Sequence, residues 1–139
     1  MIATGLMVAS AAVFFSLGTL HLIYTFVGTR LTPRDSALQA RMAEVSPGIT
    51  KEATMWSFWV GFNISHSMAA MLYGLIYGYL AIVHSGLLFS SPYLLMVGLL
   101  TVGGFFAVGK VYWFRAPVIG IGISLSCYVA SIVAAMAAF

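Results

Sequence analysis

The chain has 139 residues, of which 62% are hydrophobic and only 6% are charged, and its mean hydropathy is +1.05. A soluble domain carries about 25% charged residues, so this chain has too few of them to cover a surface that faces water. The net charge of +3 comes from six basic residues in two short segments, which do not form the basic stripe of a nucleic-acid-binding protein. The composition therefore predicts one membrane domain, residues 1–139, with the lipid bilayer and not nucleic acid as its partner.

Uncharged stretches divide the chain into four predicted membrane spans. About 20 apolar residues cross a bilayer, and residues 2–28 contain no charge. The uncharged stretch 53–109 is too long for one span, and the turn residues of 84–86 and 90–92 divide it. We therefore expect an all-α fold, a four-helix transmembrane bundle. Its helices are expected at about 2–28, 53–83, 92–109 and 117–138.

The polar segment 30–52 between the first two spans predicts a short amphipathic helix. Thr32 is placed as its N-cap, Pro33 as its first residue and Asp35 as the acidic residue of its first turn. Apolar residues then recur at i, i+4 and i+7: Leu38, Met42 and Val45. We expect this helix at about 33–46, lying on the membrane surface.

The basic residues also predict the orientation in the membrane. The first loop contains four Lys and Arg and the third contains two, whereas the second loop and both termini contain none. Cytoplasmic loops carry the excess of Lys and Arg. We therefore expect loops 1 and 3 in the cytoplasm and both termini outside.

Two histidines, His21 and His66, lie inside predicted spans. Polar residues at membrane depth are costly and usually face the interior of the bundle. With a helix rise of about 1.5 Å per residue, His21 lies roughly 13 Å inward from Arg30, and His66 roughly 21 Å inward from Glu52. The two histidines are therefore expected within one or two helical turns of each other in height.

The polar neighbours of these histidines predict a pocket between the first two spans. Steps of three and four residues place Trp59, Asn63, His66 and Tyr73 on one helix face, and Tyr24 lies one turn from His21. We expect the pocket to open toward the cytoplasmic interface. Its predicted ligand-binding residues are His21, Tyr24, Trp59, Asn63, His66 and Tyr73.

Several functions of this pocket remain open from the sequence. The leading interpretation is that it binds a lipophilic ligand or docks a larger membrane complex. The second is a membrane enzyme that moves a proton on an isoprenoid, sterol or quinone-like substrate, with His21, His66 and Tyr24 as candidate catalytic residues. The third is binding of haem b by the two histidines. The histidines would otherwise only hydrogen-bond across helices and hold the bundle together.

Other site classes are not expected. A structural metal site is disfavoured because the spans contain no acidic residue and His84 lies at the interface opposite His21. The sequence identifies no cofactor. Gly74 and Gly78 form a small-xxx-small pair, which favours close helix contact either within the chain or in a homo-oligomer.

Several motifs resemble a family of small bacterial four-helix membrane proteins to which no reaction is assigned. The most specific is Gly61-Phe62-Asn63-Ile64-Ser65-His66-Ser67, and the similarity covers nearly the whole chain. It implies the four-helix fold and a location in the bacterial inner membrane, and it includes both intramembrane histidines. The further matching segments are His21-Leu22-Ile23-Tyr24-Thr25-Phe26, Thr54-Met55-Trp56 and Gly109-Lys110-Val111-Tyr112-Trp113-Phe114.

A weaker similarity relates the chain to the sterol-isomerase and emopamil-binding group. Those proteins are also compact helical membrane proteins with a lipophilic cavity. That group relies on buried acidic residues, and the predicted spans here contain none. The similarity is therefore one of architecture and implies no reaction.

Overall fold

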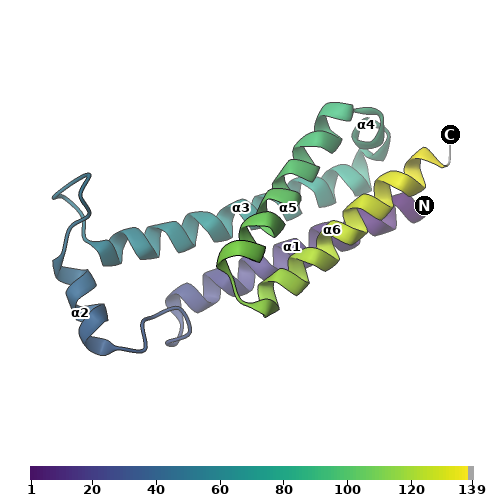
Figure 1. Ribbon diagram of the computed structural model, residues 1–139. Helices are drawn as coiled ribbons and strands as arrows, with labels where there is room; N and C mark the ends of the chain where they lie inside the picture. Colours follow the sequence, from purple (N-terminus) through teal and green to yellow (C-terminus); the bar gives the residue numbers. More distant parts are fainter. Residues whose placement is uncertain (138–139) are drawn as a thin grey trace. The chain divides into compact units, whose positions relative to one another are not determined.

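The computed structural model describes residues 1–137, which form six helices and no strand. The predicted all-α fold class is confirmed, because four of these helices are long and apolar enough to cross a membrane (Figure 1). At about 1.5 Å per residue, the shortest of them is about 31 Å long, which matches a hydrocarbon core of about 30 Å. The long helices are α1 (Ile2–Phe26), α3 (Met55–Val83), α5 (Pro92–Tyr112) and α6 (Arg115–Met136).

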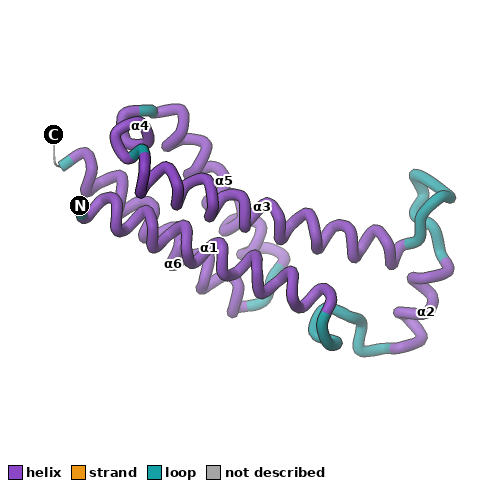
Figure 2. Tube along the Cα trace, turned by 180° about the vertical axis from the view of Figure 1, so that it is seen from behind, coloured by secondary structure: helices purple, strands orange, loops and turns teal. Residues whose placement is uncertain are grey.

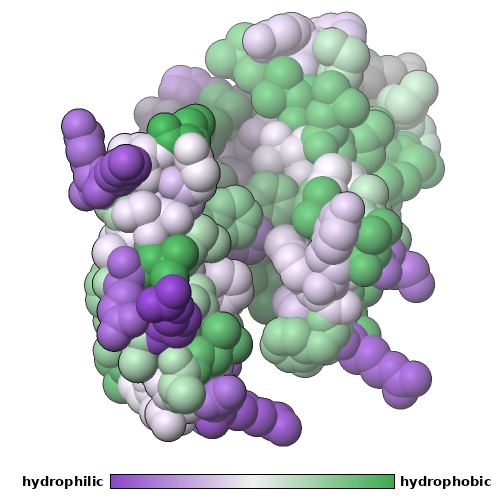
Figure 3. Space-filling model, turned by 60° about the vertical axis from the view of Figure 1, so that its left-hand side comes forward, coloured by the Kyte–Doolittle hydropathy of each residue, from purple (hydrophilic) through white to green (hydrophobic). Residues whose placement is uncertain are grey.

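The distribution of charge agrees with a multi-pass integral membrane protein. All six basic and three acidic side chains are exposed, and they lie only in 30–52 and 110–115. Figure 3 shows hydrophilic side chains gathered over the first of these segments, while hydrophobic side chains cover much of the surface elsewhere. Large apolar side chains on the long helices are more than half exposed, which suits lipid as the solvent. Examples are Leu72, Leu75, Ile76, Ile82 and Leu100.

The helix in the first loop is shorter than the sequence predicts. α2 (Ser36–Glu44) begins three residues after the expected start at position 33, and it ends two residues before position 46. The cap is Asp35 and not Thr32, because the Asp35 carboxylate accepts hydrogen bonds from the backbone N–H of Ala37 at 2.9 Å and of Leu38 at 3.4 Å. A side chain that satisfies these N–H groups defines where the helix starts.

The other helix ends follow local backbone chemistry. α1 ends at Phe26, and Gly28 follows with a positive φ of 82°, a conformation that glycine adopts at little steric cost. The connection expected as a turn after α3 holds a further short helix, α4 (Ser85–Ser90). Ser91 caps α5, and Pro92 is its first residue. The expected last helix, 117–138, begins earlier as α6, and its position 138 lies outside the described residues.

The chain divides into two compact units. Unit 1 contains residues 1–17 and the chain from residue 70 onward, and unit 2 contains residues 18–69. Both α1 and α3 contribute residues to each unit. Figure 2 distinguishes the helices from the loops, including the loops on either side of α2 in unit 2.

Unit 1 packs segments of all four long helices around an aromatic core. Phe14 of α1 is 1% exposed, and its ring lies 5.0 Å from Tyr73 of α3 and 5.1 Å from Phe105 of α5. Figures 1 and 2 show α1 and α6 side by side, and Ser10 and Ser124 join them through hydroxyl groups 3.0 Å apart. The core of this unit is therefore a four-helix bundle.

Gly74 lets α1 and α3 approach closely inside unit 1. A Cβ added at Gly74 would lie 2.8 Å from the carbonyl oxygen of Ala11 and 3.0 Å from the Cα of Phe15. One turn later, a Cβ at Gly78 would lie 3.6 Å from the Cβ of Ala11. The small-residue pair seen in the sequence is thus used for packing within the chain.

Candidate functional site

Unit 2 joins His21 of α1 to Asn63 of α3. The His21 Nε2 lies 2.8 Å from the Asn63 Oδ1, although the two residues are 42 positions apart in the chain. Asn63 is only 5% exposed, while the His21 ring is half-buried. A polar pair that crosses two apolar helices in this way provides hydrogen-bonding groups where lipid offers none.

The Asn63 side chain is held at both of its polar atoms. Its Nδ2 donates a hydrogen bond of 2.7 Å to the backbone carbonyl of Trp59, one turn earlier on α3. Its Oδ1 contacts the His21 Nε2, and one turn later the fully buried Ser67 hydroxyl donates to the backbone carbonyl of Asn63 at 2.8 Å. Asn63 therefore has a defined orientation, and it presents its amide oxygen to His21.

His66 completes the cluster that the sequence predicts. Its ring centroid lies 5.0 Å from that of His21, with the two planes at 62°. The ring of Phe62, one turn earlier on α3, stacks on the His66 ring at a centroid distance of 6.0 Å and an interplanar angle of 20°. The two intramembrane histidines are thus in direct contact, edge to face. We refer to His21, Asn63 and His66 as the histidine cluster.

Tyr24 and Trp59 make contacts of their own in unit 2. The guanidinium of Arg30 lies 4.3 Å above the ring of Tyr24, a cation–π geometry. The Trp59 Nε1 donates a hydrogen bond of 2.9 Å to the carbonyl of Leu31, and the Trp59 side chain is 41% exposed. Both residues therefore connect the first loop to the long helices of this unit. The backbone carbonyl of Trp59 also accepts the hydrogen bond from Asn63 of the histidine cluster.

Tyr73, the sixth predicted site residue, belongs to unit 1. Its hydroxyl lies 3.3 Å from the Ser10 hydroxyl, and its ring stacks on Tyr77 at 4.6 Å. Tyr73 is 4% exposed, so its hydroxyl is used inside the core of unit 1. Tyr73 was assigned to the pocket by its helical spacing from His66, but the same spacing also fits a residue of the core.

The sequence did not predict the buried hydroxyl groups that form hydrogen bonds between helices in unit 1. The Ser124 hydroxyl of α6 donates to the Ser10 carbonyl at 2.9 Å, and both serines are 0% exposed. The hydroxyls of Tyr77 and Tyr128 donate to the carbonyls of Leu94 and Leu95 on α5, each at 2.7 Å. Single small polar residues within apolar spans were the available signal, because such residues seek partners across helices.

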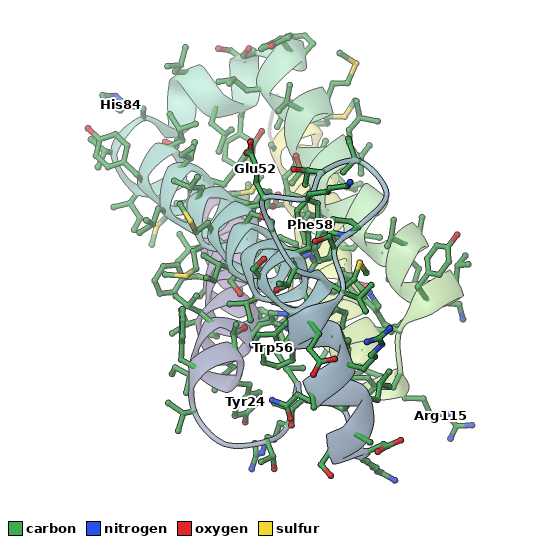
Figure 4. All side chains as sticks on the ribbon, turned by 90° about the vertical axis from the view of Figure 1, so that its left-hand side faces the viewer. Tyr24, Glu52, Trp56, Phe58, His84 and Arg115 are labelled. Atoms are coloured by element: carbon green, nitrogen blue, oxygen red, sulfur yellow. The ribbon has the colours of Figure 1, made fainter. Side chains whose placement is uncertain are left out.

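A shallow hollow lies beside α2 in unit 2. It has a volume of about 320 Å³. Figure 4 shows Trp56 beside the ribbon of α2, and it shows Glu52 well apart from Tyr24. The hollow is lined by Ser36, Gln39, Ala40, Ala43 and Trp56.

The rings of His21 and His66 do not face each other across a gap that would take a haem. Two axial ligands approach a haem iron from opposite faces of the porphyrin. Here the His21 and His66 rings meet directly at 5.0 Å, and the His21 Nε2 faces Asn63 at 2.8 Å. Within residues 1–137, no group of three His, Cys, Asp or Glu side chains is arranged to hold a metal ion. The cluster brings hydrogen-bonding side chains of α1 and α3 together.

Comparison with protein families, with curated proteins and with solved structures finds no match to this chain. The similarity to a bacterial family that the motifs indicate therefore stays a prediction. The four long apolar helices identify the chain as a small four-span membrane protein.

Proposed function

We propose that this chain is a single membrane domain whose histidine cluster binds the polar head of a lipophilic ligand. The observation that carries the proposal is the contact between His21 and Asn63, with His66 against the same imidazole. Three polar side chains at membrane depth are costly, and such residues commonly mark a functional site. His21 and His66 are both half-buried, so each residue has part of its surface accessible.

The geometry of the cluster also suits a ligand anchored by its head. The Asn63 Nδ2 is bonded to the Trp59 carbonyl and the Asn63 Oδ1 to His21, so the amide is already oriented before a ligand binds. Apolar side chains on the flanking turns, such as Phe62 at 65% exposed, would contact the hydrocarbon part of the ligand. A polar anchor in apolar surroundings is the usual composition of a small-molecule site.

A second candidate is proton transfer on such a ligand. The direct contact of two imidazoles supports it, because histidine exchanges protons near neutral pH. Incubation of the purified protein with its copurified compound, followed by mass spectrometry, separates the two candidates. An enzyme alters the compound, whereas a binding protein returns it unchanged.

We further propose the orientation that the basic loops indicate, with loops 1 and 3 in the cytoplasm of a bacterial cell and both termini outside. The exposed basic side chains of the first and third loops support it.

Docking of the histidine cluster onto a larger membrane complex, or onto a second copy of the chain, is an alternative function for the same polar residues.

The test is mass spectrometry of the small molecules extracted from detergent-purified protein, with a visible spectrum taken first. We expect a colourless protein that carries one dominant lipophilic compound, and we expect His66→Leu to lose this compound at unchanged yield. His84→Leu is the matched control, because His84 lies between α3 and α4 and contacts Tyr79. A band of haem that shifts on reduction, or bulk lipid alone in all three proteins, would contradict the proposal.

A further inference from the structure

The hydrogen bonds of the histidine cluster define which chemical group its ligand must present. Resting on the proposed function, we propose that the ligand is a lipid alcohol whose hydroxyl donates a hydrogen bond to the Nδ1 of His21. The proposal follows from the donors and acceptors of three groups: the Trp59 carbonyl, the Asn63 amide and the His21 imidazole.

The first step is the orientation of the Asn63 amide. The atom that lies 2.7 Å from the Trp59 carbonyl oxygen must carry hydrogen, because a carbonyl oxygen only accepts. It is therefore the Nδ2 of Asn63, and the Oδ1 faces His21. Turning the amide over would bring two oxygens together at Trp59 and would leave a buried carboxamide without its bond.

The second step is the proton on His21. The Asn63 Oδ1 only accepts, so the His21 Nε2, 2.8 Å away, must donate. A neutral imidazole carries one N–H, and here the Nε2 carries it. In the neutral form of His21, the Nδ1 therefore carries a lone pair. Asn63 on α3 thus selects the tautomer of a histidine on α1.

The third step is the match to a ligand. A hydroxyl group can donate to the Nδ1 lone pair, whereas a ketone, a quinone or an ether can only accept. The oxygen of an acceptor-only head would meet a second lone pair at the His21 Nδ1, and this nitrogen would be left without a hydrogen bond. Among the classes considered from the sequence, the hydroxyl-bearing prenols and sterols can donate to the His21 Nδ1, whereas the quinones cannot.

The binding test compares two probes that differ by one hydrogen-bond donor. Farnesol and its methyl ether are titrated separately into the full-length protein in nanodiscs of stated lipid composition, and the dissociation constants are measured. We expect the ether to bind about tenfold more weakly, because a lost hydrogen bond in an apolar site leaves a polar group unpaired. In Asn63→Leu, where the tautomer is no longer selected, this discrimination should fall.

A second measurement does not depend on a ligand, and it reads the tautomer in the wild-type protein. The ¹⁵N spectrum of the histidine-labelled wild-type protein, assigned with His66→Gln and His84→Gln, should show the His21 Nε2 protonated and the Nδ1 unprotonated. The opposite tautomer would overturn the inference, as would an ether that binds as tightly as the alcohol. If neither probe binds, the proposed function fails as well.

Discussion

His21 of α1 and Asn63 of α3 are joined by a hydrogen bond of 2.8 Å between Nε2 and Oδ1. The bond connects two helices that both cross the membrane, and it uses a side chain that is itself anchored to the Trp59 carbonyl. A hydrogen bond between membrane helices contributes about 0.6 to 2 kcal/mol, because the unfolded chain in the membrane also finds partners.

We expect Asn63→Leu to lower the free energy of unfolding by roughly 1–3 kcal/mol, since it removes both bonds of a buried amide. The measurement is unfolding in mixed detergent micelles, followed by circular dichroism. Ser65→Ala is the control, because Ser65 is exposed and its hydroxyl bonds only to the carbonyl of Phe62 on its own helix. Equal stability of the two variants would mean that the bond contributes nothing to the fold.

Gly74 provides a prediction about helix packing in unit 1. We expect Gly74→Ala to destabilise the protein by roughly 1–3 kcal/mol, because the new Cβ would lie 2.8 Å from the Ala11 carbonyl oxygen. Gly104→Ala is the matched control, since a Cβ at Gly104 meets nothing within 4 Å and alanine favours the helix. Thermal unfolding in detergent measures both. A Gly74→Ala variant as stable as wild type would contradict the close approach of α1 and α3.

The serine pair of unit 1 can be tested by a double-mutant cycle. Ser10 and Ser124 share a hydroxyl contact of 3.0 Å, and the Ser124 hydroxyl also donates to the Ser10 carbonyl at 2.9 Å. We expect a coupling free energy of about 0.5–1.5 kcal/mol between Ser10→Ala and Ser124→Ala. The four unfolding free energies of the cycle give this coupling directly. Strict additivity of the two substitutions would show that the hydroxyls do not interact.

The proposed orientation is tested with single cysteines. The native Cys127 is first replaced by alanine, and then Ser36→Cys and Ser90→Cys are made separately, both at exposed positions. A membrane-impermeant maleimide added to intact cells should label the second variant, and the first should react only after the cells are opened. Ser90 serves better than its neighbour Ser85, which is half-buried. The reverse pattern would invert the topology.

The sequence alone determined the class of this protein and the placement of its charges. The scarcity of charged residues and the length of the uncharged stretches require four helices, because a backbone in lipid must satisfy its own hydrogen bonds. The same helical arithmetic placed His21 and His66 at similar depths. The predicted start of α2 was wrong, because Thr32 and Asp35 are both good caps and only the backbone geometry selects Asp35.

Only the tertiary structure decided which polar residues meet. The rotation of a helix about its own axis has no signature in a single sequence, so the contacts of His21 with Asn63 and His66 could not be derived from it. For the same reason Tyr73, which shares a helical face with His66, bonds instead to Ser10 in the core of unit 1. Periodicity specifies the residues on a face, whereas the packing of neighbouring helices specifies the partner that each residue finds.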